Sequence, residues 1–344
     1  MTKIVAQHGN ILKADAEALV NTVNCVGIMG KGIALQFKQA FPENFRQYHR
    51  ACLNKSIKLG SMFIVPTGIQ RPKYIINFPT KQHWKEKSRL IDIESGLKSM
   101  VTEIKRLGIK SIAIPALGCG NGGLDWRAVE PLIQHAVSLL PNVAVQVYPP
   151  QQAPHPASIP IRTVKPTITR ARAALLVLLN TYQIEGYKHS LLEIQKLAYF
   201  LQFAGEPLRL EFVADRFGPY AEKLNFVLQA IDGHFISGYG DRTRAAEIRL
   251  LPGSVDAART FLAQFDDANQ HVQRAATLIE GFETPYGVEL LSTAHWVAKE
   301  TPLAALDVEI AIASFRAWNS RKRDLFKPDH IKVAWSRLKN QGWI

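Results

Sequence analysis

The chain has 344 residues, of which 47% are hydrophobic, and a formal net charge of +13. Because this length is about twice that of an ordinary domain, two domains are expected. The sequence has no run of about 18 apolar residues, which excludes a membrane-spanning helix. Its first residues, MTKIVAQHGN, also lack the apolar run of a signal peptide. We therefore expect a cytoplasmic protein that does not bind a membrane.

Cysteine usage also indicates a cytoplasmic protein. The chain has three cysteines, Cys25, Cys52 and Cys119. They are too few for a disulfide framework, and their spacing fits no zinc site even with the histidines of the chain. We expect neither a metal nor a cofactor.

The positive charge is concentrated in the first part of the chain. Residues 1–150 contain 19 Lys and Arg against 9 Asp and Glu, a net charge of +10, which leaves +3 for the rest. An excess confined to one domain indicates attraction to a polyanion, either a nucleic acid or a phosphate-bearing ligand.

In chain order, short β-rich runs alternate with helical patterns before residue 149. This alternation predicts an α/β layered domain with a largely parallel sheet, whose ligands bind at the carboxyl ends of the strands. The predicted strands are 3–7, 18–23, 62–66, 74–78, 111–115 and 144–148. The predicted helices are 33–41, 43–53, 91–107 and 129–140.

Six prolines between Tyr148 and Arg172 then predict an extended linker. We place the first domain at 1–149, the linker at 150–168 and the second domain at 169–344. In the second domain, apolar residues recur at helical spacing, with one extended piece at 208–214, so a mainly α-helical domain is expected. Its predicted helices are 173–182, 191–203, 221–231, 255–265, 288–298 and 330–338.

Two glycine loops carry most of the functional information. In VNTVNCVGIMGKGIALQF a strand runs into Gly27, Gly30 and Gly32 and then into a helix. Glycines let a ligand approach the backbone, and the N–H groups of the first helical turn can bind an anion. The spacing fits neither a Walker loop nor a GxGxxG fingerprint, so an ordinary strand–helix turn is the alternative.

The second loop, in SIAIPALGCGNGGLDW, also follows a β-rich run and precedes a helix. Two such loops in one small α/β domain could hold the two phosphates of a diphosphate. Asn24 and Asn121 add polar side chains suited to a ribose.

Together these segments resemble the macrodomain, whose pattern runs GDI…DAIVNAAN…GGGVA…PAIGTG. The matching segments are GNIL with EALVNTVN, GIMGKGIA and IPALGCGNGGLDW, in the same order over about residues 3–148. NFPTKQHW narrows the resemblance to the DNA ADP-ribosyl glycohydrolases called DarG, antitoxins of DarTG toxin–antitoxin pairs. The resemblance implies a three-layer α/β/α macrodomain that removes ADP-ribose from thymine in DNA by hydrolysing the N-glycosidic bond.

In macrodomains the first loop contacts the distal ribose and diphosphate, and the second loop wraps the diphosphate. Asn10 stands where macrodomains usually have an aspartate for the adenine amino group, and its carbonyl can still accept that hydrogen bond. The residues that the resemblance implies for ADP-ribose binding are Asn10, Ile11, Asn24, Gly30, Lys31, Gly32, Ile33, Leu117, Gly118, Cys119, Gly120, Asn121 and Gly122.

Lys81 follows the strand predicted at 74–78. In DarG-like macrodomains, and in the related human terminal ADP-ribose protein glycohydrolase, the matching lysine is catalytic. It could attack C1 of the distal ribose as a neutral amine, or stabilise charge on the departing base as a cation. Both alternatives stay open, because a bound diphosphate would raise the lysine pKa whereas burial and neighbouring cations would lower it.

The human relative pairs its lysine with an aspartate, and Gly122 occupies that position here. Asp125 is the only acid nearby, and it is either a helix N-cap before Trp126 or a substrate contact. Cys119 lacks a His–acid partner, so we do not expect it to be a nucleophile.

The residues after Lys81 could also contact the substrate. His83 and Trp84 either stack on an extruded base or pack against the protein. The cations Lys85, Lys87 and Arg89 either contact the DNA backbone or form a solvated face.

In the second domain, residues 190–230 resemble, more loosely, a helical domain of several antitoxins that is marked by a KL-x-YF helix and a GP-x turn. In DarG proteins the C-terminal region binds the DarT toxin, which implies a DarT-like partner. We interpret Trp296, Trp318 and Trp335 as core residues and 321–323 as a solvated run. The alternative function is a non-catalytic ADP-ribose-binding module that acts only by sequestering a partner.

Overall fold

The computed structural model describes residues 4–150, 159–182, 188–240 and 246–344. The chain divides into two compact units, Met1–Val164 and Lys165–Ile344. Residues 151–158 of the predicted linker lie outside the described residues, so the predicted domain boundaries stay a prediction. Where the description resumes, Ile159 packs into a core cluster of the first unit, and the Arg162 N–H donates to the Gln39 carbonyl at 2.9 Å.

A six-stranded sheet forms the middle layer of the first unit. The strand order is β1-β6-β5-β2-β4-β3, and every neighbouring pair is parallel except β3 with β4. The predicted largely parallel sheet is therefore confirmed. The strands are β1 (Ile4–Ala6), β2 (Ala18–Asn24), β3 (Phe63–Pro66), β4 (Tyr74–Lys81), β5 (Ser111–Pro115) and β6 (Ala144–Tyr148).

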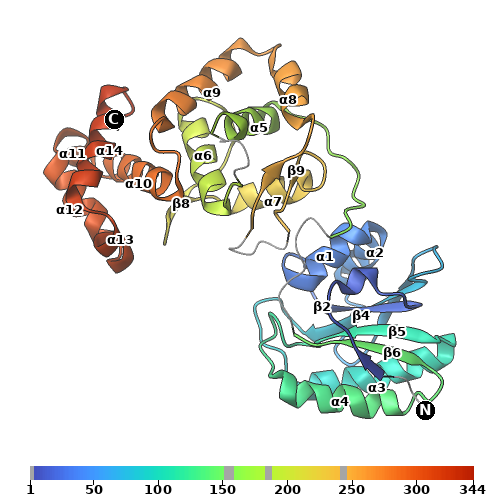
Figure 1. The fold of residues 1–344 in the computed structure, drawn as a ribbon. Coiled ribbons are helices and arrows are strands. Elements are labelled where there is room, and N and C mark those ends of the chain that lie inside the picture. The colour runs from blue at the N-terminus through green and yellow to red at the C-terminus, as the bar shows by residue number, and fades with distance from the viewer. Residues whose placement is uncertain (1–3, 151–158, 183–187, 241–245) are drawn as a thin grey trace. The chain divides into compact units, whose positions relative to one another are not determined.

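Helices cover both faces of this sheet, which gives the predicted α/β/α layers (Figure 1). Successive strand side chains point to opposite faces, so Val20 packs into one core cluster and Leu19 into another. The cluster around Val20 lies against α3 and α4, and the one around Leu19 lies against α1. The helices are α1 (Gly32–Ala40), α2 (Pro42–Leu53), α3 (Leu90–Leu107) and α4 (Trp126–Ser138), with a short 3₁₀ helix, η1 (Ile11–Lys13).

Strand β4 is three residues longer than the sequence predicts. We expected Lys81 to lie beyond the strand, and it is instead the last strand residue. The reason is that pairing with β2 continues past Phe78, so that Val23 lies opposite Pro79 and Asn24 opposite Lys81.

The second unit is mainly helical, as predicted, and is built on one large core cluster. The expected helices are all present, and four more were missed because they are short or because small residues such as Ala268 and Ala275 line their buried side. The unit comprises α5 (Arg170–Tyr182), α6 (Leu191–Phe203), α7 (Glu222–Ile231), α8 (Ser254–Leu262), α9 (Asp266–Ile279), α10 (Pro285–Glu300), α11 (Pro302–Leu306), α12 (Val308–Ala317), α13 (Ser320–Leu325) and α14 (Pro328–Asn340).

The predicted extended piece at 208–214 is largely wrong. Only its end belongs to a strand, β7 (Val213–Asp215), which pairs with β8 (Gly218–Tyr220) in a hairpin. A second small sheet joins β9 (Ile236–Ser237) and β10 (Arg249–Leu250).

The interpretation of 321–323 as a solvated run is also wrong for two of its residues. Lys322 is fully buried and donates to Glu289 at 2.8 Å and to Thr293 at 2.9 Å, and burial lowers its pKa to about 8. Arg321 donates to both carboxylate oxygens of Glu289, at 2.6 and 3.1 Å, whereas Arg323 is exposed. The cause is the buried carboxylate of Glu289, which requires cationic partners.

The three tryptophans interpreted as core residues, Trp296, Trp318 and Trp335, are half-buried and pack against the core from its edge. Among the described residues, no helix combines the length and the apolar character needed to cross a bilayer.

Candidate active site

Three neighbouring strands bring the predicted site together. In the order β5-β2-β4 all three run parallel, so their carboxyl ends meet at one edge of the sheet. The first glycine loop follows β2, Lys81 ends β4, and the second glycine loop follows β5. The backbone N–H of Cys25 donates to the Gln82 carbonyl at 3.0 Å and continues the β2–β4 contact beyond the strands.

The Asn24 side chain shapes the first loop. Its Oδ1 accepts the N–H groups of Val26 at 3.0 Å and Ile28 at 3.3 Å, and its Nδ2 donates to the Ile28 carbonyl at 2.6 Å. The Tyr48 hydroxyl braces the same turn by donating to the Asn24 carbonyl at 2.6 Å. Because Asn24 is buried and engaged within the loop, its proposed contact with ribose stays a prediction.

The first loop leads directly into α1. Lys31 is exposed and is the N-cap residue, and its side chain makes no capping hydrogen bond. The N–H groups of the first turn are thus left to an anion. Gly30, Gly32 and Ile33 are partly exposed around this helix end.

The two glycine loops approach each other at Gly32. A Cβ placed there would lie 3.0 Å from Nδ2 of Asn121, and the φ of +58° disfavours any other residue. Glycine at this position therefore allows the Asn121 side chain to lie against the start of α1.

The second loop is tightly packed on one side and open on the other. A Cβ on Gly118 would lie 2.9 Å from Leu124, and a Cβ on Gly122 only 2.3 Å from the Gly118 carbonyl oxygen. By contrast, a Cβ on Gly120 would meet no atom within 4 Å. Leu117 is buried beneath the loop. A side chain at Gly120 would therefore enter open space beside the second loop without disturbing the packing.

Lys81 connects β4 with the second loop. Its Nζ donates to the carbonyl oxygens of Asn121 at 3.0 Å and Glu86 at 3.2 Å. Burial lowers the pKa of this amine, and the positive charge of Lys87 lowers it further, while Glu86 acts in the opposite direction. The neutral form is thus more accessible than in an ordinary lysine.

Two other predicted site residues make local hydrogen bonds. Asp125 is the N-cap of α4 and accepts the Arg127 N–H at 3.0 Å, which confirms the cap interpretation and leaves a substrate contact as a prediction. Asn10 caps η1 by accepting the Leu12 N–H at 3.0 Å, and Ile11 after it is buried. The contact of Asn10 with the adenine amino group stays a prediction.

Cys119 is partly buried, and burial, followed by the charge of Asp125, raises the pKa of its thiol to about 11. The thiol is protonated at neutral pH, in line with our expectation that it is not a nucleophile.

The sequence did not reveal the residues that brace the site from behind. Besides Tyr48, Ser88 lies under the second loop, donating its N–H to the Gly122 carbonyl at 3.0 Å. Glu86 acts on Lys81 through its backbone carbonyl, which any residue type could supply. Only the position of these residues identifies them, and no motif marks it.

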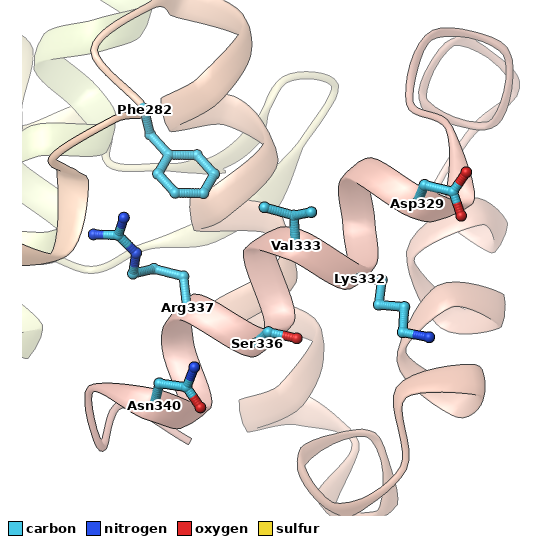
Figure 2. A pocket seen from close by; sticks show the side chains of 7 residues that line it. All are labelled: Phe282, Asp329, Lys332, Val333, Ser336, Arg337 and Asn340. Atoms are coloured by element: carbon cyan, nitrogen blue, oxygen red, sulfur yellow. The ribbon is translucent and has the colours of Figure 1, made fainter.

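A separate open cavity of about 510 Å³ lies on α14 in the second unit. Figure 2 shows that Val333 and Phe282 point toward each other across it. Its lining includes no predicted site residue, and we assign it no chemistry. The lining residues are Phe282, Asp329, Lys332, Val333, Ser336, Arg337 and Asn340.

Comparison with known proteins agrees with the layout of the first unit and extends over the second. The family model for the Macro domain matches residues 20–133. The DNA ADP-ribosyl glycohydrolase of Thermus aquaticus is 48% identical over 337 residues, which are 97% of this chain and 92% of that protein. The protein of the same name from Mycobacterium tuberculosis is 43% identical over 350 residues, 96% of this chain and 97% of that protein.

Two further similarities cover one part of the chain. A DNA ADP-ribosyl transferase-DNA ADP-ribosyl glycohydrolase fusion protein of Thermosipho africanus is 35% identical over 159 residues, 42% of this chain and 41% of that protein. The solved structure of the macrodomain of Mycobacterium tuberculosis DarG is 51% identical and covers 44% of this chain and 100% of its own, with a TM-score of 0.43.

Replacing Gly120 by Glu tests the second loop as the diphosphate site. Since a side chain at Gly120 meets open space, the fold should persist while the added carboxylate repels the phosphates. We expect ADP-ribose affinity, measured by calorimetry, to fall by about a hundredfold or more, equivalent to about 2.7 kcal/mol. Gly120→Ala is the matched control and should bind within a few-fold of wild type. Unchanged affinity of the folded Glu variant would contradict the assignment.

Proposed function

The chain belongs to the DarG family of DNA ADP-ribosyl glycohydrolases, and from this premise we propose that it removes ADP-ribose from thymine bases in DNA and acts as the antitoxin of a DarT-like toxin. The observation that carries the enzymatic part is the placement of Lys81, whose amine is held against the second glycine loop by the Asn121 carbonyl. A lysine held there is suited to a bond next to a diphosphate-bound ribose.

In this proposal the two glycine loops bind ADP-ribose, and Lys81 takes part in cleaving the bond to the base. The uncapped first turn of α1 and the backbone of the second loop hold the diphosphate, and Asn10 accepts a hydrogen bond from the adenine amino group. ADP-ribose contacts are proposed for twelve of the thirteen residues that the resemblance implied, and the fully buried Leu117 supports the second loop from beneath. His83, Trp84 and Asp125 are proposed to contact the nucleic acid.

The reaction cleaves the bond between C1 of the distal ribose and a thymine nitrogen. Water supplies a hydroxyl to C1 and a proton to the thymine, so no cofactor is needed. As a neutral amine Lys81 attacks C1 and is later displaced by water, and as a cation it stabilises the negative charge of the departing base. The lowered pKa of the amine favours the first route in the free enzyme, without removing the second.

Replacing Lys81 by Ala should abolish release of ADP-ribose from ADP-ribosylated single-stranded DNA and leave ADP-ribose binding within a few-fold. The reason is that affinity resides in the glycine loops, whereas Lys81 acts on the reacting bond. Lys110→Ala, which removes an exposed lysine before the opposite end of β5, is the control. A Lys81 variant that keeps a tenth or more of wild-type turnover would remove Lys81 from the mechanism.

The pH dependence of turnover should reveal which form of Lys81 acts. Lys87 lowers the pKa of Lys81, so Lys87→Ala should raise it and move the corresponding limb of the kcat/KM profile to higher pH. A neutral-amine mechanism gives a rate that rises with pH toward this pKa, and a cation mechanism gives a rate that falls above it. A limb that stays in place in Lys87→Ala would show that it belongs to another group.

We assign toxin binding to the second unit. The motifs that carry its resemblance are in direct contact, because Lys196 of the KL-x-YF helix donates to the carbonyl of Pro219 in the GP turn at 2.6 Å. Gln195 also exchanges two hydrogen bonds with the Ala221 backbone. The two motifs thus form one scaffold, as expected of a defined binding module. The name of the fused Thermosipho relative, which joins a transferase to a glycohydrolase, supports a transferase as partner.

Separate expression of the two compact units should divide the activities. Residues 1–164 should hydrolyse DNA-linked ADP-ribose without capturing a DarT-like transferase from the same genome, and residues 165–344 should capture it without activity. Each unit has its own core, so each should fold alone. A pull-down with each half measures this, and capture by 1–164 alone would place toxin recognition on the macrodomain.

A further inference from the structure

The segment 82–89 joins the end of β4 to the start of α3 and borders Lys81. It is folded by its own hydrogen bonds, since the Glu86 N–H donates to the His83 carbonyl at 3.0 Å and the Glu86 side chain accepts the His83 N–H at 3.2 Å. It is also anchored to the site, because Lys81 donates to the Glu86 carbonyl and Ser88 donates to the Gly122 carbonyl. The segment is therefore a fixed wall beside the reacting group.

Trp84 projects from this wall instead of packing into the protein. Its side chain is 48% exposed, and the core clusters of the described residues do not include it. The His83 ring lies 5.5 Å from the Trp84 ring, and Nζ of Lys85 lies 5.1 Å from the Trp84 ring centroid. An exposed aromatic ring flanked by a cation is the arrangement with which proteins bind single-stranded nucleic acid.

The cations of the segment extend from the second loop toward Trp84. Nζ of Lys87 lies 2.9 Å from the position that a Cβ on Gly123 would take, which places Lys87 over that loop. Lys85 is exposed next to Trp84. Arg89 forms a two-bond ion pair with Asp92, at 2.8 and 2.9 Å, which offsets its charge. Lys85 and Lys87 are thus the cations best placed for backbone phosphates.

We propose that the 82–89 segment binds the DNA strand beside the modified nucleotide, with Trp84 stacked on an unmodified neighbouring base and Lys85 and Lys87 on flanking phosphates. This inference rests on the proposed function, because it takes the bond to be cleaved to lie at Lys81. A base can lie on Trp84 only when it has left the stack of a duplex. What this inference adds to the proposed substrate is a requirement for at least one nucleotide next to the modified one, so that a modified nucleoside alone is a poorer substrate.

The test compares kcat/KM of the full chain for two substrates, an ADP-ribosylated single-stranded oligonucleotide and ADP-ribosyl-thymidine. Wild type should prefer the oligonucleotide. Trp84→Ala should reduce that preference about tenfold or more, which is the effect expected from the loss of one stacked base. Trp84→Phe, which keeps an aromatic face, should retain most of the preference and guards against a general loss of folding.

The phosphate contact proposed for Lys85 is tested through the salt dependence of kcat/KM. For Lys85→Ala, the slope of log kcat/KM for the oligonucleotide against log salt should become shallower by about 0.7, as expected for one phosphate contact on a single strand. Lys105→Ala removes an equally exposed lysine from the last turn of α3, away from the carboxyl edge of the sheet, and should leave the slope unchanged.

The outcomes distinguish a failure of this inference from a failure of the proposed function. Equal kcat/KM of wild type for both substrates, or an equal loss on both in Trp84→Ala, overturns the inference alone. Absence of turnover of either substrate by wild type overturns the proposed function, and the inference with it.

Discussion

The position of the Lys81 amine depends on one hydrogen bond, which it donates to the Asn121 carbonyl at 3.0 Å. It ties the last residue of β4 to the loop after β5, although β2 lies between these strands. The amine also donates to the Glu86 carbonyl. Burial and the charge of Lys87 lower its pKa, while the negative charge of Glu86 acts in the opposite direction. The lowered pKa shows that burial and Lys87 outweigh Glu86, so a change in the second glycine loop or in residues 82–89 would alter the protonation of Lys81.

The parallel sheet makes this contact possible, because it brings the ends of consecutive elements to one edge. Asn24 and Lys81 lie opposite each other at the ends of β2 and β4. The Asn24 side chain forms hydrogen bonds within the first glycine loop, and the Lys81 side chain donates a hydrogen bond to the second glycine loop. Neighbouring strand ends thus fix the positions of both loops, and the close approach at Gly32 brings the loops together.

The layers and both loops could be predicted from the sequence, because buried strands and glycine-rich turns are local patterns. The predictions that failed concern residues whose surroundings depend on partners distant in the sequence. The pairing of Pro79 and Lys81 with β2 is decided by a strand more than fifty residues earlier in the chain. Lys322 looks like a surface charge until Glu289, 33 residues away, is placed beside it. The bracing of Lys81 by Glu86 uses a backbone carbonyl, which leaves no mark in the residue type.

The two units differ in how their charges are distributed. With 19 Lys and Arg against 9 Asp and Glu, residues 1–150 cannot neutralise their cations internally, whatever ion pairs form. The second unit pairs several of its charges within itself, as in the contacts of Glu289 with Arg321 and Lys322 and of Glu206 with Arg170. The excess of positive charge therefore lies in residues 1–150, and salt should weaken the attraction to a polyanion that we propose for them. The partner recognition that we propose for the second unit would therefore rest more on shape and apolar contact than on net charge.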